Sequence, residues 1–225
     1  MQRRHLPLAL GLLALGAARP LHARALSERD AAAGVRQALQ RGAEAALSLL
    51  GRQDGFLGNP AVRIPLPGHL DDVGRLLRKL GQGRRVDELL TAMNRAAEAA
   101  VPQARAILLD AVRSVSVEDA LQIVRGGDTA VTTFFARKTR LPLGEKFLPI
   151  VTTATERVSL ADKYNKVAGK AAGLGVVKAE DANVQQYVTR KALDGLYLVI
   201  GEEEQKIRRD PVGTGSALLK AVFGR

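Results

Sequence analysis

The chain of 225 residues contains no cysteine and no tryptophan, and aromatic residues make up only 4% of it. The absence of cysteine excludes disulfides, thiolate nucleophiles, Cys-ligated zinc and iron–sulfur clusters. Because β-sheets are enriched in aromatic and β-branched residues, a chain so poor in aromatics and rich in alanine, leucine and arginine favours packed helices. Hydrophobic residues make up 46% of the chain and charged residues 25%, which is typical neither of a disordered protein nor of a transmembrane bundle. We therefore predict an all-α fold.

Histidine is also scarce, because two of the three histidines, His5 and His22, lie in the first 25 residues. A Ser-His-Asp triad or a histidine-rich metal site would have to use His69, which we interpret as an exposed residue at a helix start. The chain has no P-loop motif, and its Gly-Thr-Gly-Ser stretch at 213–216 lacks Rossmann spacing. We therefore expect no catalytic residue, no metal and no cofactor.

Residues 1–25 have the organisation of a secretory signal peptide. Arg3 and Arg4 precede an uncharged apolar run at 6–18, and the A-x-A pattern at 23–25 is typical of a cleavage site. The apolar run is shorter than the roughly 20 residues that span a bilayer, and the alternative is a buried N-terminal helix. Without a cysteine near the cleavage site, we expect a soluble, non-lipidated periplasmic protein that starts near residue 24 or 26.

Hydrophobic residues recur at helical spacing along most of the remaining chain. Caps, glycines and prolines divide this pattern into about ten helices, at 27–50, 70–80, 86–101, 102–112, 116–126, 128–135, 141–158, 159–172, 181–209 and 214–223. We predict N-caps at Ser116, Asp128 and Ser159, and a kink at Pro149. Residues 26–225 then form a single all-α domain, and the alternative is an N-terminal hairpin, 26–103, packed on a C-terminal bundle, 104–225.

One Gly/Pro-rich segment near 51–68 interrupts the helices. Within it Val62, Ile64 and Leu66 alternate with an arginine and two prolines, which is typical of an extended chain with one apolar face. Such an arm either docks on a partner or lies over the protein's own bundle. We favour the second interpretation.

Several motifs of the chain resemble those of one family. They are GFLGNP at 55–60, VRIPLP at 62–67, MNRAAE at 93–98, SVEDA at 116–120, RGGDTA at 125–130, TRKALDGL at 189–196 and DPVGTGSAL at 210–218. With them nearly all of 26–224 resembles an uncharacterised bacterial family of exported proteins, known only as a domain of unknown function. The resemblance implies a helical envelope protein and carries over no activity, cofactor or site.

Two polar clusters are candidate ligand-binding sites. The first consists of Arg125, Asp128 and Thr129 around a Gly-Gly turn, and the second of Arg190 and Asp194 on the helix at 181–209. Arginine can bind a carboxylate or phosphate bidentately, and the paired glycines allow close approach of the backbone. Structural alternatives are an N-cap at Asp128 and a salt bridge between Arg190 and Asp194. A small-ligand-binding protein or a hydrolase would need both clusters in one pocket.

Acidic residues at 202–204 also invite a metal-binding interpretation. However, Glu202 lies four residues before Lys206, and Glu204 lies four residues before Arg208. Pairs at this spacing are favourable on helix surfaces. We therefore interpret the three glutamates as part of a solvated face.

Positive charge concentrates in residues 137–178. The chain has a net charge of +11, but four of its 34 basic residues and none of its 23 acidic residues lie in 1–25, which leaves +7. The segment 137–178 holds nine basic and three acidic residues, and so most of that excess. The candidate anionic-surface-binding residues are Arg137, Lys138, Lys163, Lys166 and Lys170, of which the last three are spaced to share one helix face.

These features predict a non-enzymatic periplasmic binding or scaffold protein that engages an anionic envelope component. Its partner would be an anionic lipid or polysaccharide surface, or an envelope protein. We expect no nucleic-acid partner, because the chain is exported and no aromatic residues interleave with the basic ones. The alternative is the small-ligand-binding protein or hydrolase with an Arg/Asp pocket.

Overall fold

The computed structural model describes residues 28–175, 178, 181–211, 213, 216, 220 and 222. Within these residues the chain forms α-helices and one 3-10 helix and no strand, which confirms the all-α prediction. The helices are α1 (Glu28–Leu50), α2 (Gly68–Lys79), α3 (Gly83–Ala100), η1 (Val101–Ala104), α4 (Arg105–Arg113), α5 (Val117–Arg125), α6 (Ala130–Thr155), α7 (Ser159–Gly173) and α8 (Val184–Arg209). The predicted signal peptide and most of the predicted helix at 214–223 lie outside the described residues.

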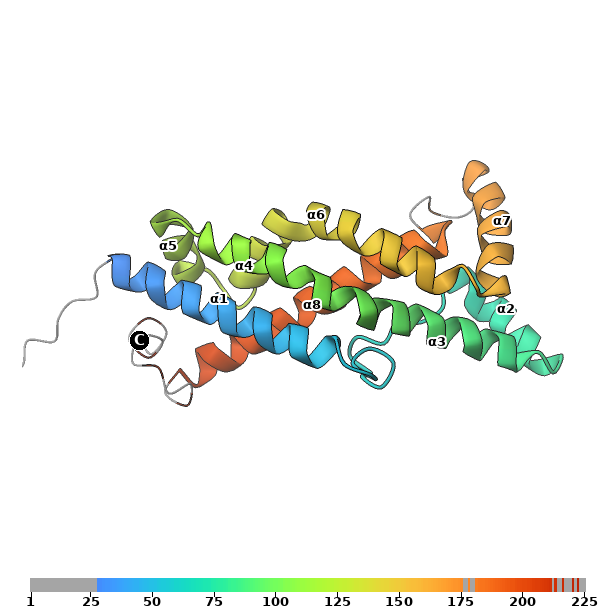
Figure 1. The fold of residues 1–225 in the computed structure, drawn as a ribbon, viewed down its shortest axis with the longest axis horizontal. Coiled ribbons are helices and arrows are strands. Elements are labelled where there is room, and N and C mark those ends of the chain that lie inside the picture. Colours follow the sequence, from blue (N-terminus) through green and yellow to red (C-terminus); the bar gives the residue numbers. More distant parts are fainter. Residues whose placement is uncertain are drawn as a thin grey trace, which may run out of the picture.

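The longest helices build an elongated bundle (Figure 1). α8 packs along α6 on one side and α1 on the other, and α3 packs on α6. The short helices α4 and α5 pack against α1 at one end, whereas α2 and α7 lie at the other end, where α7 stands across the long axis. This arrangement leaves one side of α7 facing away from the bundle.

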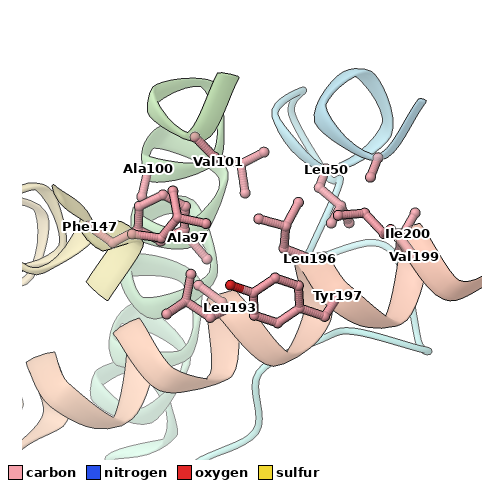
Figure 2. Close-up of a cluster of buried hydrophobic side chains, with 14 of the residues drawn as sticks. Leu50, Ala97, Ala100, Val101, Phe147, Leu193, Leu196, Tyr197, Val199 and Ile200 are labelled. Carbon is pink, nitrogen blue, oxygen red and sulfur yellow. The ribbon is translucent and has the colours of Figure 1, made fainter. Parts of the chain in front are cut away.

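The core lies where α1, α3, α6 and α8 meet (Figure 2). Leu196 and Ile200 of α8, Phe147 of α6 and Leu50 of α1 are fully buried there. Small side chains on α3, such as Ala97, let the neighbouring helices approach closely. Each large side chain contributes roughly 1.5–3 kcal/mol by its burial. One connected cluster joins residues from both sides of position 103, from α1 through α8.

The expectation of about ten helices is not matched, mainly because two predicted helices are one. α6 runs without a break from Ala130 to Thr155 and contains Pro142 and Pro149 inside it. A proline cannot donate to the carbonyl four residues earlier, which here belongs to Lys138 or Glu145. Both of these residues are exposed, so water can satisfy their carbonyls. The helix therefore continues through Pro142, which the sequence pattern placed in the first turn of a new helix, and the predicted kink at Pro149 stays a prediction.

Local caps explain where several helices begin. Ser116 accepts from the backbone N–H of Asp119, and the Asp119 carboxylate accepts from the Ser116 N–H, so this predicted cap is confirmed as a capping box. The prediction of Asp128 as a cap is wrong, because α6 begins after Thr129 and neither side chain bonds its first turn. The predicted cap Ser159 is instead the first residue of α7, whose N-cap is Val158.

The extended segment lies over the protein's own bundle, as we favoured from the sequence. Val62, Ile64 and Leu66 are buried. Ile64 N donates to Asn94 Oδ1 at 2.9 Å, and Asn94 Nδ2 donates to Ile64 O at 3.0 Å. Asn94 thus pairs with the arm as a neighbouring strand would, and satisfies backbone groups that burial would otherwise leave unpaired.

A carboxylate anchors the start of this arm. Glu98 of α3 is 5% exposed and accepts from the backbone N–H groups of Phe56 and Leu57, both at 3.0 Å. Arg95 bridges Glu98 and Asp54 at 2.6 and 2.8 Å. The MNRAAE motif therefore holds the GFLGNP turn through charged hydrogen bonds.

Candidate functional site

The turn between α5 and α6 contains the first predicted ligand cluster. Arg125, Asp128 and Thr129 are exposed there. A cavity of about 260 Å³ beside the turn is lined by Thr129 and Arg137, among others. Gly126 is required by packing, because a Cβ at this position would lie 2.6 Å from the Cβ of Ala130. Gly126 therefore has a structural reason that involves no ligand, whereas a Cβ at Gly127 would meet nothing within 4 Å.

An anion site at the start of α6 is already filled by the chain itself. Glu204 of α8 is 5% exposed and accepts from the Val131 N–H at 3.1 Å. Its carboxylate also accepts from Arg208 at 2.8 Å, and Arg208 donates to the carbonyl of Ile123. Backbone N–H groups at a helix start are a natural position for a bound anion. Here a side chain occupies that position.

The buried environment of Glu204 changes its acidity. Burial raises its pKa, although the hydrogen bonds from Arg208 and the α6 backbone act in the opposite direction. The interpretation of 202–204 as a solvated face is therefore wrong for Glu204, whereas its predicted pairing with Arg208 is confirmed. Lys206 pairs with Glu203 at 2.6 Å rather than with Glu202, and this hydrogen bond raises the pKa of Lys206.

The second predicted cluster does not form an internal pair. Arg190 pairs with Asp181 in the segment before α8, and Asp194 pairs with Arg140 of α6 at 2.9 Å. Arg140 also lies over the ring of Tyr197, with 5.0 Å between its Cζ and the ring centroid. The salt bridge expected between Arg190 and Asp194 is therefore wrong in its partners.

The two clusters line different cavities. Thr129 lines the cavity beside the α5–α6 turn, whereas Arg190 lines a groove between α6 and α8. The 11 positions from Thr129 to Arg140, the partner of Asp194, correspond to about 16 Å along α6. Arg137 lines both cavities, but neither cavity is lined by residues of both predicted clusters.

Sequence reasoning missed the groove between α6 and α8. It encloses about 630 Å³ and has an apolar floor that includes Leu141, Gly144, Leu148 and Leu193. Leu141 and Leu148, two large apolar side chains of this floor, are 75% and 37% exposed. The signal in the sequence was the spacing of Leu141, Gly144 and Leu148 at i, i+3 and i+7, which places them on one helix side.

The outer side of α7 carries the predicted lysine face. Lys163, Lys166 and Lys170 are all exposed, while Tyr164 and Ala168 on the opposite side are buried. None of the three lysines forms a salt bridge with a described residue. Their charges are therefore presented to solvent together, as the spacing predicted.

The basic residues on α6 lie in a different electrostatic setting. Arg137 lies 3.6 Å from Asp119, and Arg140 pairs with Asp194. Asp119 has a lowered pKa, chiefly because it accepts from the Ser116 backbone and also because Lys138 and Arg137 are nearby. The predicted anionic-surface set thus divides into an α6 part with acidic neighbours and an α7 part without described ion pairs.

Comparisons with known proteins place the chain in a family. The model of a family described as "Protein of unknown function (DUF4197)" matches residues 25–224. The chain belongs to this DUF4197 family. No curated protein and no solved structure matches it. The DUF4197 match spans all the described helices and agrees with the family that the motifs resemble.

Metal-ligating side chains do not gather in the described part of this DUF4197 protein. In 28–175 and the described residues after it, no three histidine, cysteine or acidic residues lie together as a metal site would require. Across the same residues, no helix has the length and apolar character needed to cross a membrane. The side chain of His69 lies outside the described part, and its interpretation stays a prediction.

Proposed function

We propose that this DUF4197 protein is a non-enzymatic periplasmic binding protein that docks on an anionic lipid surface through the outer side of α7. The observation that carries the proposal is the combination of charge and apolar surface on this helix. Exposed lysines at 163, 166 and 170 flank Val167, which is 70% exposed, and Leu174 follows at 81% exposure. Amphipathic helices with this pairing are typical of peripheral membrane contact.

Helical geometry supports a contact that uses both kinds of residue. Positions 163, 167 and 170 are spaced i, i+4 and i+7 and so follow one line along α7, and Leu174 is the residue directly after its end. Each lysine near an anionic leaflet contributes about 1 kcal/mol, and the attraction decays within a Debye length of about 10 Å. Val167 between the lysines and Leu174 after the helix end add burial at the acyl boundary, which a soluble polyanion does not offer.

The inner side of α7 holds the helix firmly in place. The Tyr164 hydroxyl donates to the carbonyl of Asp181, and burial raises the pKa of this tyrosine. Asn165 donates to Gln185 at 2.8 Å and accepts from the Val184 N–H at 2.8 Å. These bonds fix α7 to the start of α8. The helix therefore does not have to become ordered when it binds, which lowers the entropy cost of binding.

Co-sedimentation with vesicles tests the proposal. We expect the protein to bind phosphatidylglycerol-containing vesicles at low salt, to bind phosphatidylcholine vesicles weakly, and to be released at about 0.5 M salt. The variant K163Q/K166Q/K170Q should lose affinity by more than about tenfold, since each lysine contributes about 1 kcal/mol. Unchanged binding by this variant would contradict the proposal.

A matched variant controls for net charge. Arg29, Arg52 and Arg105 are exposed and lie outside α7, so R29Q/R52Q/R105Q removes the same charge elsewhere. This control should keep most of the vesicle affinity. A second variant, V167S/L174S, distinguishes a lipid surface from a polysaccharide. It should weaken binding to vesicles more than binding to a soluble polyanion. If it weakens both equally, the partner is not a lipid surface.

A further inference from the structure

The floor of the groove between α6 and α8 includes one position without a side chain, Gly144. A Cβ at Gly144 would lie 4.0 Å from Leu193 Cδ1, which is an ordinary contact, so nothing in the fold requires glycine there. Leu141 and Leu148 flank this position and are 75% and 37% exposed. Together these residues line an apolar trough of about 630 Å³, within the roughly 300–1,000 Å³ that small-molecule sites occupy.

Arginines border this trough. Arg137 and Arg140 line it on α6, one to two turns before Gly144, and Arg190 lines it on α8. The lining holds one acidic residue, Glu145, and each arginine also pairs with an aspartate outside the lining: Arg137 with Asp119, Arg140 with Asp194 and Arg190 with Asp181. The side chains of Arg137 and Arg140 are 57% and 45% exposed. Exposed ion pairs such as theirs contribute about 0–1 kcal/mol, so an incoming anion can compete for these guanidinium groups.

We propose that the α6–α8 groove binds a single-chain anionic amphiphile, with the acyl chain over Leu141, Gly144 and Leu148 and the anionic headgroup at Arg137 and Arg140. The charge of the border selects an acid, and the apolar floor selects a hydrocarbon chain. The headgroup can be the carboxylate of a fatty acid or the phosphate of a lysophospholipid, because guanidinium groups bind both. This site is separate from the outer side of α7 and does not rest on vesicle docking.

The same charges argue against a second copy of the chain as the occupant. In a two-fold symmetric dimer through this face, the same patch meets itself. The arginines of one groove would then lie near those of the other, and like charges at an interface are unfavourable. An anionic amphiphile meets no such repulsion and covers the exposed leucines.

Fluorescence of bound cis-parinaric acid, a natural fluorescent fatty acid, tests the site. We expect saturable binding to the purified protein, with competition by palmitate and by lysophosphatidylglycerol. If only one competes, its headgroup identifies the ligand class. Lysophosphatidylcholine, with a similar chain and no net charge, should compete at least about tenfold less well. Absence of parinarate binding, or equal competition by all three, would overturn the proposal.

A groove-filling variant locates the bound chain. Gly144→Leu places a side chain in the trough without a backbone clash, and it should weaken parinarate binding by at least about tenfold while the circular dichroism spectrum stays unchanged. Gly169→Leu is the matched control, because a Cβ at Gly169 meets nothing within 4 Å and α7 lies outside the groove. Equal binding by G144L and the native protein would overturn the assignment.

Two charge variants test the headgroup position and the independence of the groove from α7. R137Q/R140Q should lose affinity for palmitate and keep its weaker affinity for lysophosphatidylcholine. K163Q/K166Q/K170Q should bind parinarate like the native protein, so failure of vesicle docking and failure of groove binding are distinguishable. A native dimer that G144L converts to a monomer would show that a second copy covers the groove and would overturn the proposal.

Discussion

The carboxylate of Glu204 accepts a hydrogen bond from the backbone N–H of Val131, which lies 73 positions earlier in the chain. Through this contact the C-terminal part of α8 closes the start of α6, and Arg208 extends the connection to the end of α5 through the carbonyl of Ile123. The end of α5 and the start of α6 thus meet the C-terminal part of α8, which is distant in sequence, at one buried acid. The capping residue that α6 lacks in its own sequence is supplied by another helix.

Replacement of Glu204 by glutamine should change how stability depends on pH. An unfolded glutamate ionises near pH 4.5, and burial raises the pKa of folded Glu204 above that value. Between the two values the folded state binds more protons, so stability falls as pH rises through this window. We therefore compare the free energy of unfolding of the native protein with that of E204Q. The difference, native minus E204Q, should fall by at most about 1.4 kcal/mol per pH unit above pH 4.5 and level off above the folded pKa.

Denaturant unfolding at a series of pH values measures this difference. E203Q is the control, because Glu203 pairs with Lys206 on the surface and its replacement should shift stability much less. Glu204→Ala should cost about 3 kcal/mol, because Arg208 and the Val131 N–H then lose a buried partner. A difference between native and E204Q that rises with pH above 4.5 would contradict the assignment.

Loss of the Asn94 side chain should loosen the extended arm. Asn94 is fully buried, and Asn94→Ala leaves both the N–H and the carbonyl of Ile64 without a partner. We expect a loss of about 2–3 kcal/mol in unfolding free energy. Limited proteolysis should cut within 51–67 faster than in the native protein. Thr91→Ala, at an exposed position of the same helix, should change stability by less than about 0.5 kcal/mol.

The hydroxyl of Thr189 is expected to weaken the fold. Thr189 is 7% exposed, and its Oγ1 meets no hydrogen-bond partner among the described residues. Valine has the same shape without the hydroxyl, so Thr189→Val removes the cost of burying an unpaired polar group. Thermal unfolding should show a gain of about 1 kcal/mol. A loss of similar size would indicate that the hydroxyl is bonded in solution.

Hydrophobic periodicity predicted most of the fold because the buried residues repeat at helical spacing. The boundaries of α1, α5 and α8 lie within a few residues of those predicted, and α5 and α8 each have a local signal, the Ser116 cap and the Asn183 cap. Pro142 misled the division of α6, because the cost of a helical proline depends on whether the freed carbonyl faces water. That property belongs to the packed structure and is not visible in the sequence.

The site residues were harder to predict, because partners chosen from sequence spacing are only one option in three dimensions. Arg190 and Asp194 have ideal i, i+4 spacing, yet each bonds a residue from another segment. Glu204 looked like its exposed neighbours, because one turn of helix contains both buried and exposed sides. The lysines of α7 were predictable as a face, since their relative positions depend on a single helix.

Gly195 of α8 should be sensitive to the addition of a side chain. A Cβ at this position would lie 2.8 Å from Cε1 of Phe56 and 3.2 Å from Cβ of Val62. Alanine favours a helix over glycine by about 1 kcal/mol, whereas overpacking a core costs about 1–3 kcal/mol. Because Phe56 is fully buried and its ring has no free space, the clash should outweigh the helix preference. We expect Gly195→Ala to lose about 1 kcal/mol in chemical denaturation.

Two comparisons identify the cause of that loss. Gly144→Ala meets only the ordinary 4.0 Å contact with Leu193, so it should be neutral or stabilising by up to about 1 kcal/mol. Phe56→Leu shortens the ring that the new methyl would meet, so the double variant G195A/F56L should be more stable than the sum of the two single losses predicts. If the stability losses of G195A and F56L simply add in the double variant, then Gly195 does not set the distance between α8 and the arm.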